Sequence, residues 1–511
     1  MSDETKTEDP AEGENTEVSG KFGRTFWMLN CIEMFERLAY FALRVLAPIY
    51  IAQASKNPGG LHLKQEQKGW IYGWWFVFQS LLPIVTGGFS DRYGYKKILT
   101  LSFTMNITGY LIMAFFHSYY GFFAGVIILA TGTALFKPSV QGSLANSLNE
   151  KNTSMGWGIF YWVVNVGAVI SHYIPGPIVG DKTAGGWRLL FLVCAGFTAV
   201  NYLMLLTYKD VSSGAPKTET AWQVLKRTIV NVAEARLIAW LLIMSCFWLM
   251  MYQLWDLQPN FIEDWIDSSA IAAYLQSFPE EWHLVEMGDQ GVLRVPQQIL
   301  ISLNAISIVA LVVPVSWLVR KMRTLSAMLI GMLMATAGLL LAGLTSNVWF
   351  LLLGIFGFSL GEMLTGPKKQ EYLGIIAPPG KKGMYLGYVN IPVGIGGFFG
   401  SIIAGKVYGS YGEKATLSLK YLMSETDFGR GKDWDGKVAS LEDSSGVKRT
   451  ESFAKLQEVL GLDGVATTRL LWKRYRPHLH TWIPFAAIGG VAAIALYIFG
   501  RMAKRWKDMN A

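Results

Sequence analysis

The sequence has little charge and few cysteines for its length. Of 511 residues, 16% are charged and 52% are hydrophobic, and the mean hydropathy is +0.31. Water-soluble chains of this length rarely have such a composition. The shortage of charge therefore argues against a soluble protein and favours one embedded in a lipid bilayer.

The chain also lacks the residue patterns of disulfide frameworks, metal sites and common enzymes. Its cysteines are Cys31, Cys194 and Cys246, and each falls within an apolar segment. They allow neither a disulfide framework nor a metal-ligand spacing. No nucleophile–base pair and no phosphate-binding loop is present, and the six histidines lie largely in loops or near predicted helix ends. We therefore expect no enzyme and no metal.

The charge that is present is basic overall, with 45 Lys and Arg against 37 Asp and Glu. The basic residues do not gather on one polar domain, which argues against a nucleic-acid partner. They lie in short loops between apolar runs, as in membrane proteins. The first 25 residues are polar and acid-rich, and they lack the basic start and short apolar core of a secretory signal. We expect residues 1–25 to form a disordered cytoplasmic tail.

Twelve apolar segments are long enough to cross a bilayer. A helix needs about 20 residues, at about 1.5 Å each, to span the hydrocarbon core. The sequence thus predicts an all-α membrane protein with 12 transmembrane helices in two six-helix bundles. The predicted spans are 26–54, 69–90, 96–116, 119–143, 157–180, 187–208, 237–258, 296–319, 325–344, 347–376, 384–410 and 481–501.

The loops rich in Lys and Arg all fall on one side of this arrangement. They are residues 91–97, 209–236, 320–323 and 378–383, together with the end of the chain. Positive charge favours the cytoplasmic side, so we expect both termini to be cytoplasmic, in a plasma or bacterial inner membrane.

A polar linker at 209–236 divides the spans six and six. It predicts an N-terminal bundle at 26–208, a C-terminal bundle at 237–501 and a cytoplasmic tail at 502–511. A cavity between two such bundles is where secondary transporters hold their substrate.

The C-terminal bundle carries two insertions on its external side, at 259–295 and 411–480. The second contains two helix-like pieces, SFAKLQEVLGL and ATTRLLWKRY. We expect it to pack as a small cap.

The first predicted span contains four charges, in CIEMFERLAYFALRVLAPIY (31–50). Ionised groups inside a membrane are costly and usually face an aqueous cavity. Glu33, Glu36, Arg37, Tyr40 and Arg44 follow the spacing of one helix face, so they should line that cavity. Glu33 and Arg37 are spaced to neutralise each other, which leaves Glu36 or Arg44 to find partners on other helices. The alternative is a static ion-pair lock between helices.

Two further charges lie within predicted spans. Lys137 precedes Pro138, where the proline should free a carbonyl towards the cavity. It would act there as a mobile cation; alternatively, it reaches the cytoplasmic edge of the membrane. Glu362 is the only acid of its span, and Pro367 should break or kink that helix. Its alternative role is in helix packing.

Glycines recur in VGIGGFFG (393–400) with one small-xxx-small spacing. This spacing lets helix backbones approach closely, so we expect a packing role.

The segment GGFSDRYGYK (87–96) resembles the loop signature of the major facilitator superfamily, G-x-x-x-D-R-x-G-R-[KR], with Tyr95 in place of a basic residue. The resemblance implies conformational gating. Asp91 would lie at a helix amino terminus and form an ion pair with a neighbouring basic residue. This contact would break as the two bundles rock against each other. The implied gating residues are Gly87, Asp91, Arg92, Gly94 and Lys96.

Several segments together are similar to the proton-coupled oligopeptide transporters, the POT family. EMFERLAYFALR resembles its E-x-x-E-R signature, and GIFYWVVNVGAVI, FKPSV, QQILISLNAISIVALVVP and LGEMLTGP resemble segments of its fifth, fourth, eighth and tenth helices. The resemblance implies a symporter that imports di- or tripeptides, or related small zwitterions, by alternating access, with the proton as coupling ion and no other cofactor. The implied proton-coupling residues are Glu33, Glu36, Arg37, Lys137 and Glu362, and the implied substrate-binding residues are Tyr40, Arg44, Lys137, Tyr161, Asn165, Asn304 and Glu362.

Two positions in the spans depart from the POT pattern. In FWLMMYQLWD, Tyr252 stands where the family commonly has an acid, and Asp256, one helical turn on, is a possible substitute. Phe41 replaces a second aromatic hydroxyl. The alternatives are a superfamily carrier of another metabolite or anion, and a membrane receptor that no longer transports. The sequence does not indicate an oligomeric state.

Overall fold

The computed structural model describes residues 21–149, 152–208, 234–377 and 382–503. Most of the predicted N-terminal tail, of the 209–236 linker and of the C-terminal tail lies outside these residues. Below, the N-terminal half means the described residues before 209, and the C-terminal half means those after 233.

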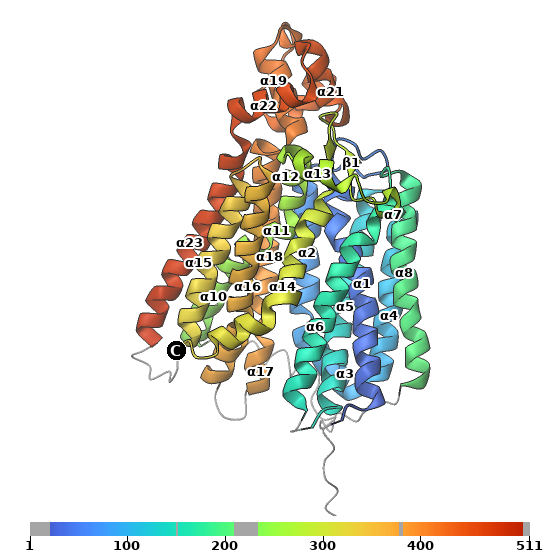
Figure 1. Ribbon diagram of the computed structural model, residues 1–511, viewed down its shortest axis with the longest axis vertical. Helices are drawn as coiled ribbons and strands as arrows, with labels where there is room; N and C mark the ends of the chain where they lie inside the picture. The colour runs from blue at the N-terminus through green and yellow to red at the C-terminus, as the bar shows by residue number, and fades with distance from the viewer. Residues whose placement is uncertain (1–20, 150–151, 209–233, 378–381, 504–511) are drawn as a thin grey trace, which may run out of the picture.

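Long helices run side by side along one axis, with the two halves next to each other (Figure 1). The helices of the N-terminal half are α1 (Arg24–Ala52), α2 (Gln65–Leu81), α3 (Pro83–Tyr93), α4 (Tyr95–Phe115), α5 (Tyr119–Asn146), α6 (Thr153–Tyr173), α7 (Pro175–Val179) and α8 (Ala184–Thr207). Those that form the body of the C-terminal half are α10 (Ala235–Met251), α11 (Gln253–Asp256), α14 (Gln297–Val319), α15 (Thr324–Gly343), α16 (Val348–Ile376), α17 (Lys382–Gly387), α18 (Asn390–Tyr411) and α23 (Pro477–Ala503).

Each predicted span coincides with a helix or with two consecutive helices. Within the described residues, ten helical segments are long and apolar enough to cross a membrane. Helix α1 is not among these ten, and its 29 residues include the four charges discussed above. The α2–α3 pair, which is interrupted at Leu82 just before Pro83, is also outside them. The all-α membrane fold is confirmed.

Proline positions explain some of the helix breaks but not all. Helix α6 ends just before Pro175, yet α16 is unbroken through Pro367 and α5 through Pro138. The expected break at Pro367 does not occur, and the expected kink stays a prediction. Neighbouring helices in a bundle can compensate for one missing backbone hydrogen bond.

Both insertions lie at the same end of the molecule, which we call the cap end (Figure 1). The first forms α12 (Gln258–Trp265), α13 (Ser269–Leu275), the 3-10 turn η1 (Glu280–Trp282) and an antiparallel pair of strands, β1 (Glu286–Met287) and β2 (Leu293–Arg294). The second forms α19 (Lys414–Glu425), η2 (Asp427–Gly429), η3 (Val438–Ser440), α20 (Leu441–Ser445), α21 (Arg449–Leu460) and α22 (Gly464–Tyr475). We call residues 414–475 the cap.

The cap has apolar packing of its own. Leu419, Met423 and Leu441 are buried together, and Trp434 packs against them. Both predicted helix-like pieces are helices, α21 and α22. A separate small cluster of this kind holds the insertion in a defined shape.

Helix α18 joins the two halves. It packs against α2 on one side and α10 on the other. A methyl group at Gly396 would lie 2.4 Å from the Ser245 carbonyl oxygen, and one at Gly397 would lie 2.3 Å from the Phe76 ring. The glycines of VGIGGFFG therefore allow close helix contact, as the spacing predicts.

Candidate functional site

The charged stripe of α1 is buried. Glu33, Glu36, Arg37, Tyr40 and Arg44 are each at most 7% exposed. The Arg37 Nε atom lies 3.1 Å from Glu33 Oε1, which confirms the expected pair, and its Nη2 atom contacts Glu36. One guanidinium therefore reaches both acids, and Glu36 has an ion-pair partner on its own helix.

Arg44 has a different environment. Its guanidinium carbon lies 4.1 Å, 4.5 Å and 4.9 Å from the ring centres of Tyr72, Trp75 and Phe76, all on α2. Aromatic faces attract the cation without neutralising it. Nη1 of Arg44 is buried without a hydrogen-bond partner, and among the described residues no carboxylate pairs with this arginine. Arg44 is thus a fixed cation able to accept an anionic group.

Lys137 faces the charges of α1 from α5. It interacts electrostatically with Glu33, Glu36 and Arg37. No ion pair of Lys137 within 4.0 Å is found in the part of the chain that the structure describes. Two acids and two cations are therefore grouped inside the N-terminal half.

Glu362 is the acidic group of the opposite half. Asn304 on α14 donates hydrogen bonds from Nδ2 to Glu362 Oε2 and to the Ser359 hydroxyl, each 3.0 Å long. Asn304 and Glu362, both of which the resemblance implies as substrate-binding residues, are thus in direct contact. Lys369 lies two turns further along the same face of α16 and interacts electrostatically with Glu362. Its ammonium lies 4.0 Å from the Trp248 ring centre.

The remaining predicted substrate-binding residues line α1 and α6. Tyr40 donates a 2.8 Å hydrogen bond to Gln79 of α2. Asn165 donates a 2.9 Å hydrogen bond from Nδ2 to the backbone oxygen of Tyr161, so its amide is engaged within α6. Tyr161 is 46% exposed, and its hydroxyl interacts with Glu362 of the other half.

Electrostatic interactions also cross between the halves around these residues. Besides Tyr161 with Glu362, they join Arg44 to Tyr252 and Lys137 to Lys369. Residues of the candidate site in one half therefore lie within electrostatic reach of residues in the other half. An arrangement with cations on one side and an acid on the other suits a ligand that carries both charges.

Comparisons with known proteins agree with this architecture. Residues 29–278 match the family model described as Major Facilitator Superfamily. The nucleoside transporter NupG superposes with a TM-score of 0.65 at 11% identity, covering 93% of this chain and 100% of that one. Residues 29–278 thus match the major facilitator superfamily, and the chain as a whole has the major facilitator fold.

Other relatives within the major facilitator superfamily differ in what they carry. A POT family transporter in complex with a thioalcohol-conjugated peptide superposes with a TM-score of 0.65 at 15% identity, over 95% of this chain and 97% of that one. The multidrug resistance protein MdtH of Enterobacter sp. (strain 638) is 20% identical over 66% of this chain and 75% of its own. A Na(+), Li(+), K(+)/H(+) antiporter of Planococcus maritimus is 22% identical over 71% and 85%.

The superfamily loop motif adopts a geometry that partly differs from expectation. Gly94 has a φ of +91° and turns the chain between α3 and α4. Asp91 lies in the last turn of α3, so its placement at the start of the following helix is wrong, because the chain stays helical up to Tyr93. The side chain of Asp91 is outside the described part. Gly87 lies within α3.

The two basic residues of this motif have different surroundings. Arg92 is exposed and stacks 5.6 Å from the Tyr93 ring centre. Lys96 donates a 3.1 Å hydrogen bond to the backbone oxygen of Tyr208, next to the C-terminus of α8. This is the favourable end of a helix for a cation.

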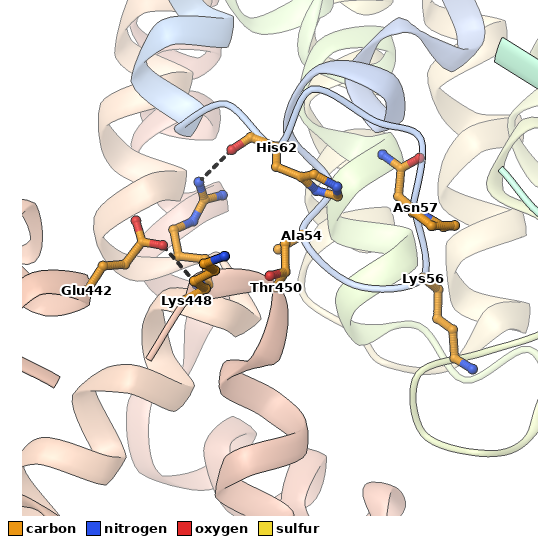
Figure 2. Close-up of a pocket in the computed structure, with 9 residues that line it drawn as sticks. Ala54, Lys56, Asn57, His62, Glu442, Lys448 and Thr450 are labelled. Atoms are coloured by element: carbon orange, nitrogen blue, oxygen red, sulfur yellow. Dashed lines mark hydrogen bonds between the residues drawn. The ribbon is translucent and has the colours of Figure 1, made fainter. Parts of the chain in front are cut away.

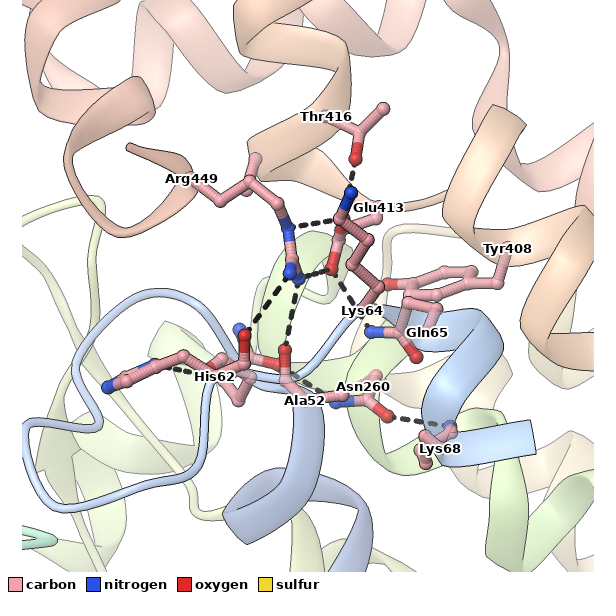
Figure 3. Close-up of polar contacts among 12 residues, drawn as sticks. Ala52, His62, Lys64, Gln65, Lys68, Asn260, Tyr408, Glu413, Thr416 and Arg449 are labelled. Carbon is pink, nitrogen blue, oxygen red and sulfur yellow. Dashed lines mark hydrogen bonds and ion pairs between the residues drawn. The ribbon is translucent and has the colours of Figure 1, made fainter. Parts of the chain in front are cut away.

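A buried pair that the sequence analysis missed joins the two halves towards the cap end. Lys68 of α2 and Asp256 of α11 are completely buried, with Lys68 Nζ 3.2 Å from Asp256 Oδ1 (Figure 3 shows Lys68 with its neighbour Asn260). Lys68 also donates to Asn260 Oδ1 at 3.0 Å. Asp256 therefore has a partner in the other half. Its place on the last turn of an apolar span was the only signal in the sequence.

Asp264 is a second buried acid at the cap end. It accepts hydrogen bonds from Gln53 Nε2 of the N-terminal half at 2.9 Å and from the Tyr408 hydroxyl at 2.6 Å. Burial raises the pKa of Asp264 to about 6, although nearby Lys414 opposes the rise.

Proposed function

We propose that this protein, which has the major facilitator fold, is a proton-coupled symporter that imports di- or tripeptides, or related small zwitterions, by alternating access. One observation carries the proposal. Arg44, a buried cation without a carboxylate partner in the described residues, lies in one half, and Glu362, held by Asn304, lies in the other. The pair offers complementary charges to the two ends of one small molecule.

The charges assign each end of a peptide to one half. Arg44 would form a charge-assisted, bidentate hydrogen bond with the peptide carboxylate, and Lys137 would add a second cation. Glu362 would accept from the peptide amino group, while Asn165 and Tyr161 would contact its backbone. Because the ligand's ends bind different halves, its binding would draw the halves together.

The ion cluster of α1 suits proton coupling. Glu33 and Glu36 share the guanidinium of Arg37, so protonation of either acid would weaken one ion pair and leave the other. A weakened pair would let α1 move relative to α5, which carries Lys137. Moving one proton inward across the membrane supplies about 2.3 kcal/mol per 100 mV, which is enough to drive accumulation.

The orientation forms part of the same proposal. With both termini cytoplasmic, the cap end is external. The halves are joined there by Lys68 with Asp256 and by Gln53 with Asp264. The described conformation would therefore be closed to the outside.

The solved structures of similar fold support a peptide substrate without deciding it. They include POT family transporters in complex with a conjugated peptide and with 5-aminolevulinic acid, both at low identity. The second candidate function is transport of another metabolite or anion. It is favoured by Tyr252, which stands where the POT pattern has an acid and packs 4.3 Å from the Phe76 ring.

The test is binding of a matched ligand series to the purified protein by isothermal titration calorimetry. Dialanine, N-acetyl-dialanine and dialanine amide differ only in their end charges. We expect dialanine to bind and either blocked form to bind at least about tenfold more weakly, since each loses one charged hydrogen bond. Equal binding of the three forms would favour the second candidate. So would the absence of binding by all three if a nucleoside or a small anion binds.

A further inference from the structure

The cap reaches across to the N-terminal half through one arginine. Arg449 is the first residue of α21, and it is 8% exposed. It donates from Nη1 to the backbone oxygen of His62 at 3.3 Å and from Nη2 to that of Ala52 at 3.4 Å (Figure 3). Ala52 ends α1, and His62 lies in the loop between α1 and α2.

A carboxylate from the C-terminal half holds Arg449 in this position. Glu413, the residue before α19, accepts from Arg449 Nε at 3.2 Å and also contacts Nη2. The same carboxylate accepts from Gln65 Nε2 of α2 at 3.2 Å. Glu413 is 4% exposed, so the pair is shielded from water. Three hydrogen bonds of this cluster thus cross from one half to the other.

The chemistry of the acceptors suits an arginine. The Ala52 oxygen is at the C-terminal end of α1, where the helix dipole attracts a cation. The guanidinium fork spans a carboxylate on one half and backbone oxygens on the other, which a lysine ammonium cannot match.

Beside this contact, a cavity separates the cap from the N-terminal half. Its volume is about 570 Å³, and Figure 2 shows Lys56, Asn57 and His62 on one side and Lys448 and Thr450 on the other. Where this cavity lies, the loop and the cap are held apart. The hydrogen bonds of Arg449 therefore carry the contact at this place.

We propose that Arg449 is a latch that holds the cap end closed. When the halves separate there, the bonds from Arg449 to Ala52 and His62 and from Gln65 to Glu413 must break. The cap is then a moving part of the transport cycle and sets the balance between the closed and open states of this end. The inference rests on the alternating access of the proposed function, but not on the identity of the substrate.

The experiment measures distances between spin labels on the two sides of the latch. Labels are placed at Lys56→Cys in the loop and Asp443→Cys in the cap, both exposed positions, after replacement of the three native cysteines. We expect the Arg449→Gln variant to raise the ratio of long to short distances about tenfold. The reason is that the buried Glu413 carboxylate loses its charged partner and the bonds to Ala52 and His62 are lost. Arg449→Lys should have an intermediate effect.

Two controls separate the latch from general damage. Arg474→Gln removes an exposed pair with Glu425 inside the cap and should leave the distances unchanged. Adding Glu413→Gln to Arg449→Gln should change the ratio less than the two single effects combined, since the residues act as one unit.

The outcomes are distinguishable. Distances in Arg449→Gln equal to those of the parent, in a sample where Lys68→Gln does lengthen them, would overturn the latch alone. If no variant and no ligand ever lengthens them, the halves do not open at this end, and alternating access fails with the latch. If the variant does not fold, a bifunctional thiol reagent joining Lys56→Cys to Thr450→Cys in the otherwise unchanged protein must block transport for the latch to stand.

Discussion

At the scale of single residues, the two halves of the candidate site make opposite demands on a ligand. Arg44 is already desolvated by the rings around it, so an incoming carboxylate would meet a cation that has little water to lose. Glu362 is different, because its carboxylate already accepts a hydrogen bond from Asn304. Arg44 should therefore govern affinity for the carboxylate end of the ligand, and Glu362 should couple binding to protonation.

Arg44→Gln is expected to weaken dialanine binding about 10- to 100-fold and to leave binding of dialanine amide nearly unchanged. The reason is that the variant loses a charge that only the free carboxylate uses. Calorimetric titration of both ligands measures the difference. Equal weakening for the two would show that Arg44 supports the cavity rather than the carboxylate.

Glu362→Gln is expected to abolish uptake driven by a proton gradient while sparing peptide exchange. Glutamine keeps the shape of the side chain and its contact with Asn304 but cannot take up or release a proton. Glu371→Gln on the same helix is the matched control, since Glu371 pairs with Lys368 and is more exposed. Uptake and exchange are measured in proteoliposomes, and undiminished accumulation in Glu362→Gln would remove this residue from coupling.

Asp264 should add a pH-dependent contribution to stability. Its pKa is about 6 in the folded protein against an ordinary value of 3.8, so the folded state binds the proton more tightly. The contribution is therefore fully present below about pH 4 and is lost as the pH rises through 6. Comparing the unfolding temperature of the parent with that of Asp264→Asn at pH 5 and pH 7.5 measures it. The gap between the two proteins should change over this window, and a constant gap would contradict the assignment.

At the scale of elements, the packing of α18 on α2 sets how closely the halves approach. A methyl group at Gly405 would lie 2.4 Å from the backbone oxygen of Gln65, a contact that side chains cannot relieve. Gly405→Ala should therefore destabilise the protein by about 1–3 kcal/mol, the usual range for overpacking. Gly490→Ala on α23, where nothing lies within 4 Å, is the control. Unfolding temperatures that fall equally in both would contradict this account of the α2–α18 contact.

The elements were predictable because hydropathy and helix length act locally. Spans of about 20 apolar residues must be helical in a bilayer, so the helices of the described residues follow the predicted ranges. Where helices break was less predictable, because a proline breaks α6 at Pro175 but not α16 at Pro367. The difference depends on neighbouring helices, which the local sequence does not reveal.

At the scale of the whole molecule, closure of the cap end depends on pairs far apart in the sequence. Lys68 and Asp256 are 188 residues apart, and Arg449 and Ala52 are 397 apart. Taken alone, Lys68 and Asp256 are charges at the edge of a span, and Arg449 is one of many charges in the 411–480 insertion. Only the packing of the two halves brings them together. The α1 stripe was predictable because helix periodicity places its residues on one face.

The halves are held together near the cap end by buried polar contacts. Such contacts are costly to leave unpaired, so opening of this end needs a ligand, a proton or water to satisfy the exposed groups. The central charges face one another further from the cap. Alternating access would then consist of exchanging the cap-end contacts for contacts at the opposite end around a fixed central site.

The most direct test of the account is uptake of dialanine by the purified protein in proteoliposomes, with an inward proton gradient imposed and then dissipated by an uncoupler. The account predicts accumulation above the external concentration while the gradient lasts, and loss of that accumulation when the uncoupler is added. A proton-driven carrier of zwitterions would be contradicted by the absence of uptake. It would also be contradicted if dialanine only reached equal concentrations on both sides, with or without the proton gradient.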